Sequence, residues 1–113
     1  AGNLSVDGGT IKLDGNYPTG TSNVALGDTA LDSLTSGGDY NTALGHNVLT
    51  ATTSGNRNTG LGERVLAANT TGARNTAAGR TSMLVNTTGS YNSSFGMDTL
   101  VSNVTGQGNT TAG

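Results

Sequence analysis

The sequence predicts an all-β fold, a parallel β-roll or β-helix built from 17-residue repeats. Composition and periodicity predict it. Gly (19), Thr (20) and Asn (13) make up 52 of the 113 residues, whereas Leu, Ile, Val and Phe together supply only 20. With a net charge of −2 and one proline, such a chain is more typical of short coils sharing a narrow core than of disorder. Six asparagines at nearly constant spacing define the coils: Asn23, Asn41, Asn58, Asn75, Asn92 and Asn109.

Each repeat carries further fixed positions after its asparagine. The consensus is N-T-A-L-G-x-x-x-L-x-x-N-T-T-G-x-x, and the first repeat has one extra residue near Gly37 and Gly38, which we place in a loop. Two glycines per repeat exclude a helix interior and suit two short strands joined by two tight turns. The predicted turn glycines, where φ is positive or another backbone comes close, are Gly27, Gly45, Gly62, Gly79 and Gly96.

The large apolar residues fall in two columns. One column stands three residues after the asparagine and the other eight residues after it. The first lies next to a column of small residues that includes Ala43 and Ala77, so this large column and the small column should face opposite sides of a strand. About two large side chains per repeat cannot offset the ordering of about 17 backbone residues, which indicates association between chains. The predicted core of the coil or of a trimer is Leu26, Leu31, Leu44, Leu49, Leu61, Leu66, Met83, Phe95 and Leu100.

The chain divides into residues 1–20 and residues 21–113. In the first segment Leu4, Val6, Ile11 and Leu13 alternate with polar residues around Asp7-Gly8-Gly9, which predicts a β-hairpin and a lead-in turn. The second segment holds five full repeats and the start of a sixth. We therefore expect a fibre segment that belongs to something longer.

Charge and composition exclude several classes of function. The chain has no cysteine, and no apolar run approaches the roughly 18 to 20 residues that span a bilayer, so no membrane insertion is expected. Five basic residues and a pI near 4.9 argue against nucleic-acid binding.

Catalytic and metal-ligating groups are scattered. His46 is the only histidine, and a metal or catalytic role would need partners that the sequence does not supply. The acids do not outline a cleft, although association could bring two of them together as a glycosidase needs. We expect no enzyme activity, no cofactor, no bound metal and no catalytic residues.

One surface column combines aromatic and cationic side chains. Directly before successive asparagines stand Tyr40, Arg57, Arg74 and Tyr91, which stack in register if the coils stack. Such a ladder could pack against the sugar rings of a cell-surface polysaccharide. The simpler interpretation is a solvated face on which charges avoid like neighbours.

The repeats carry a family likeness. Asn41-Thr42-Ala43-Leu44-Gly45 through Gly55, and the following unit from Asn58 through Gly72, resemble the N-T-A-x-G…L…N-T-T-G repeats of bacteriophage tail-fibre proteins. The lead-in Ile11-Lys12-Leu13-Asp14-Gly15-Asn16-Tyr17-Pro18 is similar to that of phage fibres. Asn23-Val24-Ala25-Leu26-Gly27 is also similar to the S-V-A-L-G motif in the head repeats of trimeric autotransporter adhesins. The resemblance implies a left-handed β-roll or β-helix that forms a homotrimeric fibre.

The expected function is structural. The chain would be part of a phage tail or virion fibre, extracellular, bound to copies of itself and to other tail or fibre proteins, and would hold or assist host-surface attachment. The alternative is a trimeric adhesin head on a bacterial surface. A weaker one is an ice-binding solenoid, suggested by the in-register Thr42, Thr59, Thr76 and Thr110. Whether each coil closes within one chain or is interwoven among three stays open.

Overall fold

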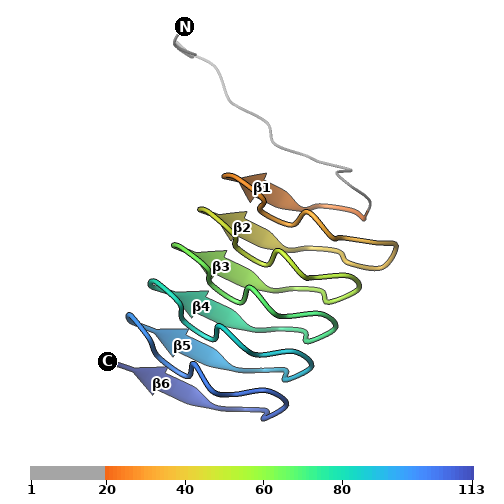
Figure 1. Cartoon of the computed structure of the whole chain (residues 1–113). Helices are drawn as coiled ribbons and strands as arrows, with labels where there is room; N and C mark the ends of the chain where they lie inside the picture. The colour runs from red at the N-terminus through yellow and green to blue at the C-terminus, as the bar shows by residue number, and fades with distance from the viewer. Residues whose placement is uncertain (1–19) are drawn as a thin grey trace, which may run out of the picture.

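The computed structural model describes residues 20–113 and shows one parallel β-solenoid (Figure 1). The expected β-hairpin in residues 1–20 lies almost wholly outside the described residues. Six three-residue strands form one parallel sheet in sequence order. They are β1 (Val24–Leu26), β2 (Thr42–Leu44), β3 (Thr59–Leu61), β4 (Thr76–Ala78), β5 (Ser93–Phe95) and β6 (Thr110–Ala112).

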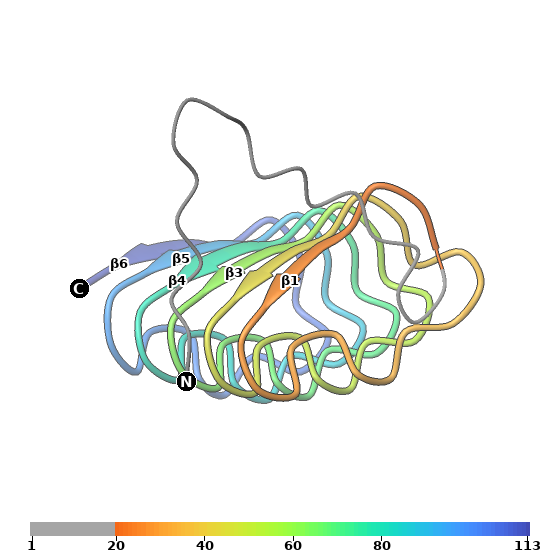
Figure 2. The same cartoon turned by 90° about the horizontal axis from the view of Figure 1, so that it is seen from above.

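Equivalent positions of successive repeats pair directly. Ala25 is aligned with Ala43 and Leu44 with Leu61, a register that continues through β6. Seen along the stack, the strands form one wall and the rest of each coil returns beneath them (Figure 2). The predicted parallel coils of about 17 residues are confirmed, and each coil closes within a single chain.

The coil has one strand, not the two that the repeat length suggested. The return path is bent because residues in the left-handed region interrupt it, with φ of 57° at Arg64 and 51° at Leu66 in the third coil. An extended run cannot continue through such residues.

Backbone hydrogen bonds to neighbouring coils hold these left-handed residues. The N–H of Arg64 donates to the carbonyl of His46 in the preceding coil at 2.9 Å. The N–H of Leu66 donates to the carbonyl of Ser82 in the following coil at 3.1 Å. A left-handed conformation costs a non-glycine residue about 1–2 kcal/mol, so bonds on both sides of the coil are what maintain it.

Asparagine side chains fill one side of the interior. Asn41, Asn58, Asn75 and Asn92 are fully buried, and each accepts the backbone N–H of the next asparagine in the series, at 3.0 Å from Asn58 to Asn41 Oδ1. Each also donates through Nδ2 to a glycine carbonyl near the end of its own coil, at 2.8 Å from Asn58 to Gly72. We call this series, which runs from Asn23 to Asn109, the Asn ladder. Because it satisfies polar groups along the whole stack, it lets a coil with few apolar residues exclude water.

The apolar core occupies the rest of the interior and changes character along the stack. Leu31, Leu49, Leu66 and Met83 lie in line and are fully buried. Near the last coils, hydroxyl groups take over: Ser94 receives a hydrogen bond from Ser82 at 2.9 Å and donates one to Thr99 at 2.7 Å. The interior of the solenoid is therefore mainly apolar near the first coils and richer in hydroxyl groups near the last.

Candidate functional site

The outer face of the sheet is the most unusual surface of the solenoid. In the four inner strands, β2 to β5, the middle residue is buried and the third residue is more exposed, as with Ala43 and Leu44 of β2. Pairing in register turns the third residues into one continuous row, which we call the outer row. Its members are Leu26, Leu44, Leu61, Ala78, Phe95 and Ala112.

The large side chains of the outer row are exposed to solvent in the single chain. Leu26 is 62% exposed and Phe95 48%. Leu44 and Leu61, whose coils lie between those of Leu26 and Phe95, are also exposed. Isolated exposed apolar residues are ordinary, but a straight file of them marks an interaction surface.

The residues of the predicted core lie on both faces of the sheet, some inside the coil and some on its outer face. Leu31, Leu49, Leu66 and Met83 are inside the coil, and Leu100 is partly buried against them. The remaining four, Leu26, Leu44, Leu61 and Phe95, belong to the outer row and are exposed, outside the buried core of residues 20–113.

A glycine follows each outer-row residue. Gly45 has φ of 126°, and a Cβ built there would lie 1.8 Å from the carbonyl oxygen of the matching glycine in the next coil. The other predicted turn glycines, Gly27, Gly62, Gly79 and Gly96, also have positive φ. Each of these sites thus needs glycine for its backbone conformation, and most need it for close packing too.

One flank of the outer row carries the predicted aromatic and cationic ladder. Arg57 lies over the Tyr40 ring and Arg74 over the Tyr91 ring, each with its guanidinium carbon 5.2 Å from the ring centroid. Arg74 also donates to the Tyr91 hydroxyl. The structure therefore brings these four residues together as two separate cation–π pairs.

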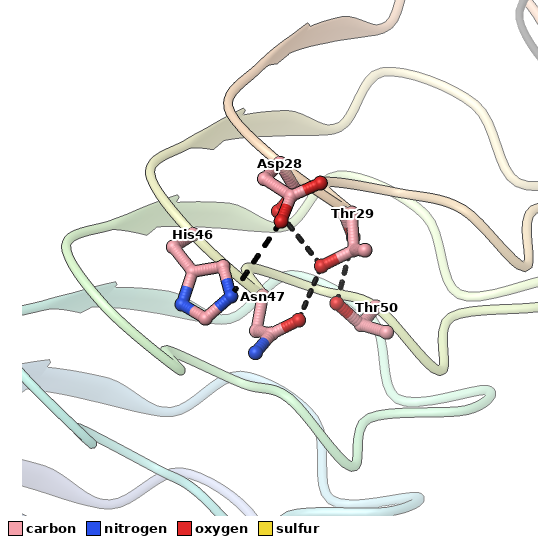
Figure 3. Close-up of polar contacts among 5 residues, drawn as sticks. All are labelled: Asp28, Thr29, His46, Asn47 and Thr50. Atoms are coloured by element: carbon pink, nitrogen blue, oxygen red, sulfur yellow. Dashed lines mark hydrogen bonds and ion pairs between the residues drawn. The ribbon is translucent and has the colours of Figure 1, made fainter.

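The other flank carries mixed charges. His46 Nε2 lies 3.8 Å from Asp28, and Arg80 lies 3.7 Å from Glu63, all on exposed side chains. Figure 3 shows that the polar groups around His46 serve contacts between coils. Thr29 Oγ1 donates to the carbonyl of Asp28 and contacts Asn47, and Thr50 donates to the carbonyl of Thr29 at 2.7 Å. Exposed pairs of this kind contribute at most about 1 kcal/mol to stability.

Within residues 20–113, no three His, Cys, Asp or Glu side chains gather as a metal site would require. The same residues include no helix long and apolar enough to cross a membrane.

Sequence reasoning did not place the asparagines inside the coil. The available signal was their constancy: every repeat has Asn at this position, whereas the residue before it varies among Ser, Tyr, Arg and Gly. A polar residue that no repeat replaces is one whose side chain makes a contact that others cannot make.

No protein-family profile matches the chain, and no curated protein or solved structure is significantly similar to it. The functional argument therefore depends on the solenoid and its surfaces.

Proposed function

We propose that this chain is a structural segment of a homotrimeric fibre in a phage tail or virion, where it holds or assists attachment to the host surface. The observation that carries the proposal is the outer row. A file of apolar side chains repeated at every coil has the form of an interface along the length of a rod.

The energy available from covering the row is substantial for a chain of this size. Full burial of a Leu or Phe side chain contributes about 1.5–3 kcal/mol. Since the four large members are roughly half exposed, covering them would contribute about 4 kcal/mol per chain. Native domains are stable by only about 5–15 kcal/mol, so this surface matters to the stability of the fold.

A second copy of the same chain is the occupant that fits the row best. Only a partner with the same coil spacing, about 4.8 Å, matches every member at once. Three copies with their outer rows around one axis form a closed assembly and a straight fibre. A left-handed coil, implied by the resemblance of the repeats to phage fibres, is part of this proposal.

The molar mass in solution tests the assembly. The 113-residue chain should elute with three times its mass of 11.1 kDa in light scattering, and Leu61→Lys should convert it to monomer because a charge then sits within the interface. Val104→Lys, an exposed apolar position outside the outer row, should leave the trimer intact. A folded wild-type monomer, or equal effects of both substitutions, would contradict the proposal.

The role in a fibre follows from mechanical properties. Continuous coil-to-coil hydrogen bonds resist bending, and three copies multiply weak contacts with a host surface. Immunogold labelling with an antibody to this chain should mark tail fibres of the source particle. Labelling of a bacterial envelope instead would favour the alternative, a trimeric adhesin head.

Ice binding has one observation in its favour. Thr42, Thr59 and Thr76 are aligned in neighbouring strands and share the outer face with the outer row. They are only half exposed and give one hydroxyl per coil, a sparse array for ordering water. Absence of thermal hysteresis would exclude this function.

A further inference from the structure

We propose that the solenoid binds a linear acidic polysaccharide along its flank, on a surface that we call the Tyr–Arg strip: Tyr40, Arg57, Arg74 and Tyr91. This inference goes beyond the proposed fibre role and does not depend on the number of chains in the assembly. It rests on the geometry, the free donors and the local charge of these four residues.

The backbone fixes all four residues in one way. Each has φ between 56° and 60°, and each donates its N–H to a carbonyl of the preceding coil, as Arg57 does to Asp39 at 2.9 Å and Arg74 to Asn56 at 3.0 Å. Identical backbone geometry at each level makes the strip a regular ladder. A ligand that follows the strip therefore meets side chains that are already positioned.

The two arginines diverge, each toward its own tyrosine. Although they occupy adjacent coils, Arg57 stacks on Tyr40 in the coil before and Arg74 on Tyr91 in the coil after. The stacking orients both guanidinium planes and separates two like charges.

Most of the hydrogen-bonding capacity of these arginines is unused. A guanidinium has five N–H donors. Arg57 uses one, on Asn56 Oδ1 at 3.4 Å, and Arg74 uses one, on the Tyr91 hydroxyl. The remaining donors point to no acceptor in residues 20–113, so they are available to carboxylate or sulfate groups, which a guanidinium binds in bidentate fashion.

The charge of the strip is also uncompensated. Arg80, on the other flank, is paired with Glu63 at 3.7 Å, but neither arginine of the strip has a carboxylate within 4.0 Å among the described residues. Asp39, which directly precedes Tyr40, uses its carboxylate to accept the backbone N–H of Thr21 at 2.7 Å. A chain of net charge −2 thus concentrates two cations on one line.

The tyrosines give the strip its preference for sugar. Tyr40 is 54% exposed and Tyr91 55%, and beyond them the same column continues with Ser22 and Gly108. Since neither small residue can cover an aromatic ring, the ring face opposite each arginine is open for a sugar ring to pack on. Tyr40 and Tyr91 are three coils apart, about 14 Å at the usual strand spacing, which suits a polymer several sugars long. Two cations are too few to hold a nucleic acid at physiological salt.

Binding of defined polysaccharides to the full 113-residue chain tests the proposal. The probes are polygalacturonate, dextran sulfate, neutral dextran and single-stranded DNA, measured by titration calorimetry at physiological salt. Arg57→Asn with Arg74→Asn removes both charges, and Asn tolerates the left-handed conformation. The control with the same change in charge is Arg64→Asn with Arg80→Asn, two exposed arginines outside the strip.

We expect at least one acidic polysaccharide to bind wild type and the control alike, and to bind the strip variant at least about tenfold more weakly. Circular dichroism and light scattering of the same samples report folding and assembly, so a failure to trimerise is seen separately. Equal losses in both double variants would show general electrostatic attraction and overturn the proposal. So would neutral dextran or DNA binding as tightly as the acidic polysaccharides, or no binding by either acidic probe.

Discussion

Replacing one buried asparagine by its isosteric acid should destabilise the solenoid strongly, and more at neutral than at acidic pH. In Asn58 both side-chain N–H donors are used, toward Gly72 O at 2.8 Å and Asn41 Oδ1 at 3.2 Å, while Oδ1 accepts two hydrogen bonds from Asn75. Asn58→Asp keeps the acceptor but puts an oxygen where the donors were, facing two other oxygens.

The magnitude follows from these contacts. An unpaired carboxylate in this interior will be held protonated, and protonating an aspartate of ordinary pKa near 3.9 at pH 7 costs about 4 kcal/mol. The protonated acid has one O–H in place of two N–H donors, so one hydrogen bond is lost, worth about 1 kcal/mol. We therefore expect a loss of about 5 kcal/mol at pH 7. Near pH 4 the loss should fall to about 1–2 kcal/mol, because protonation then costs little.

Urea unfolding followed by circular dichroism at pH 7 and pH 4, at one protein concentration, measures both values. The matched control is Asn56→Asp, the same change on a half-buried side chain outside the Asn ladder, which should cost less than about 0.5 kcal/mol. Equal stability of the two variants at pH 7 would refute the assignment of Asn58 to a closed interior. A loss that does not shrink at pH 4 would refute the electrostatic part of the reasoning.

Three other substitutions probe the glycines, the core and the left-handed residues. Gly45→Ala should cost more than about 3 kcal/mol in urea unfolding, because its Cβ meets backbone, whereas Gly37→Ala, with open space around it, should cost about 1 kcal/mol; equal costs would contradict the close packing of coils. Met83→Ala should lower the free energy of unfolding by about 2–5 kcal/mol and lower the melting temperature. Met97 is 63% exposed, so Met97→Ala should change stability little. A larger loss for Met97→Ala than for Met83→Ala would contradict the assignment of Met83 to the core. In urea unfolding, Arg64→Asn should be more stable than Arg64→Ala by about 0.5–1 kcal/mol, because Asn tolerates the φ of 57° at this position. Equal stability of the two variants would mean that this conformation carries no strain.

The repeat was predictable from sequence because its spacing is set by covalent geometry. Residues that recur every 17 positions must stack if the coils stack, so the spacing predicted the parallel pairing and a core role for Leu49 and Leu66. It did not distinguish the inside of the coil from an interface between chains. The opposite faces of Ala43 and Leu44 followed from the alternation of a strand.

The left-handed residues were not predictable in the same way. Nothing in the intrinsic preferences of Leu66, Arg64 or Tyr91 favours positive φ, and glycine is the residue that normally signals it. Hydrogen bonds between coils impose the conformation, and they exist only once the stack has formed. The predicted second strand failed for this reason, since its sequence lies where these residues bend the chain.

The Asn ladder makes the length of this molecule a discrete quantity. A chain that gains or loses one whole repeat regains every asparagine, glycine and leucine contact, and its axis changes by one step of about 4.8 Å. Gains or losses of other sizes would set an asparagine opposite a residue with the wrong chemistry, except at a turn such as that near Gly37, where an added Cβ meets nothing. Unequal recombination between repeats would therefore give folded rods whose lengths differ by whole coils.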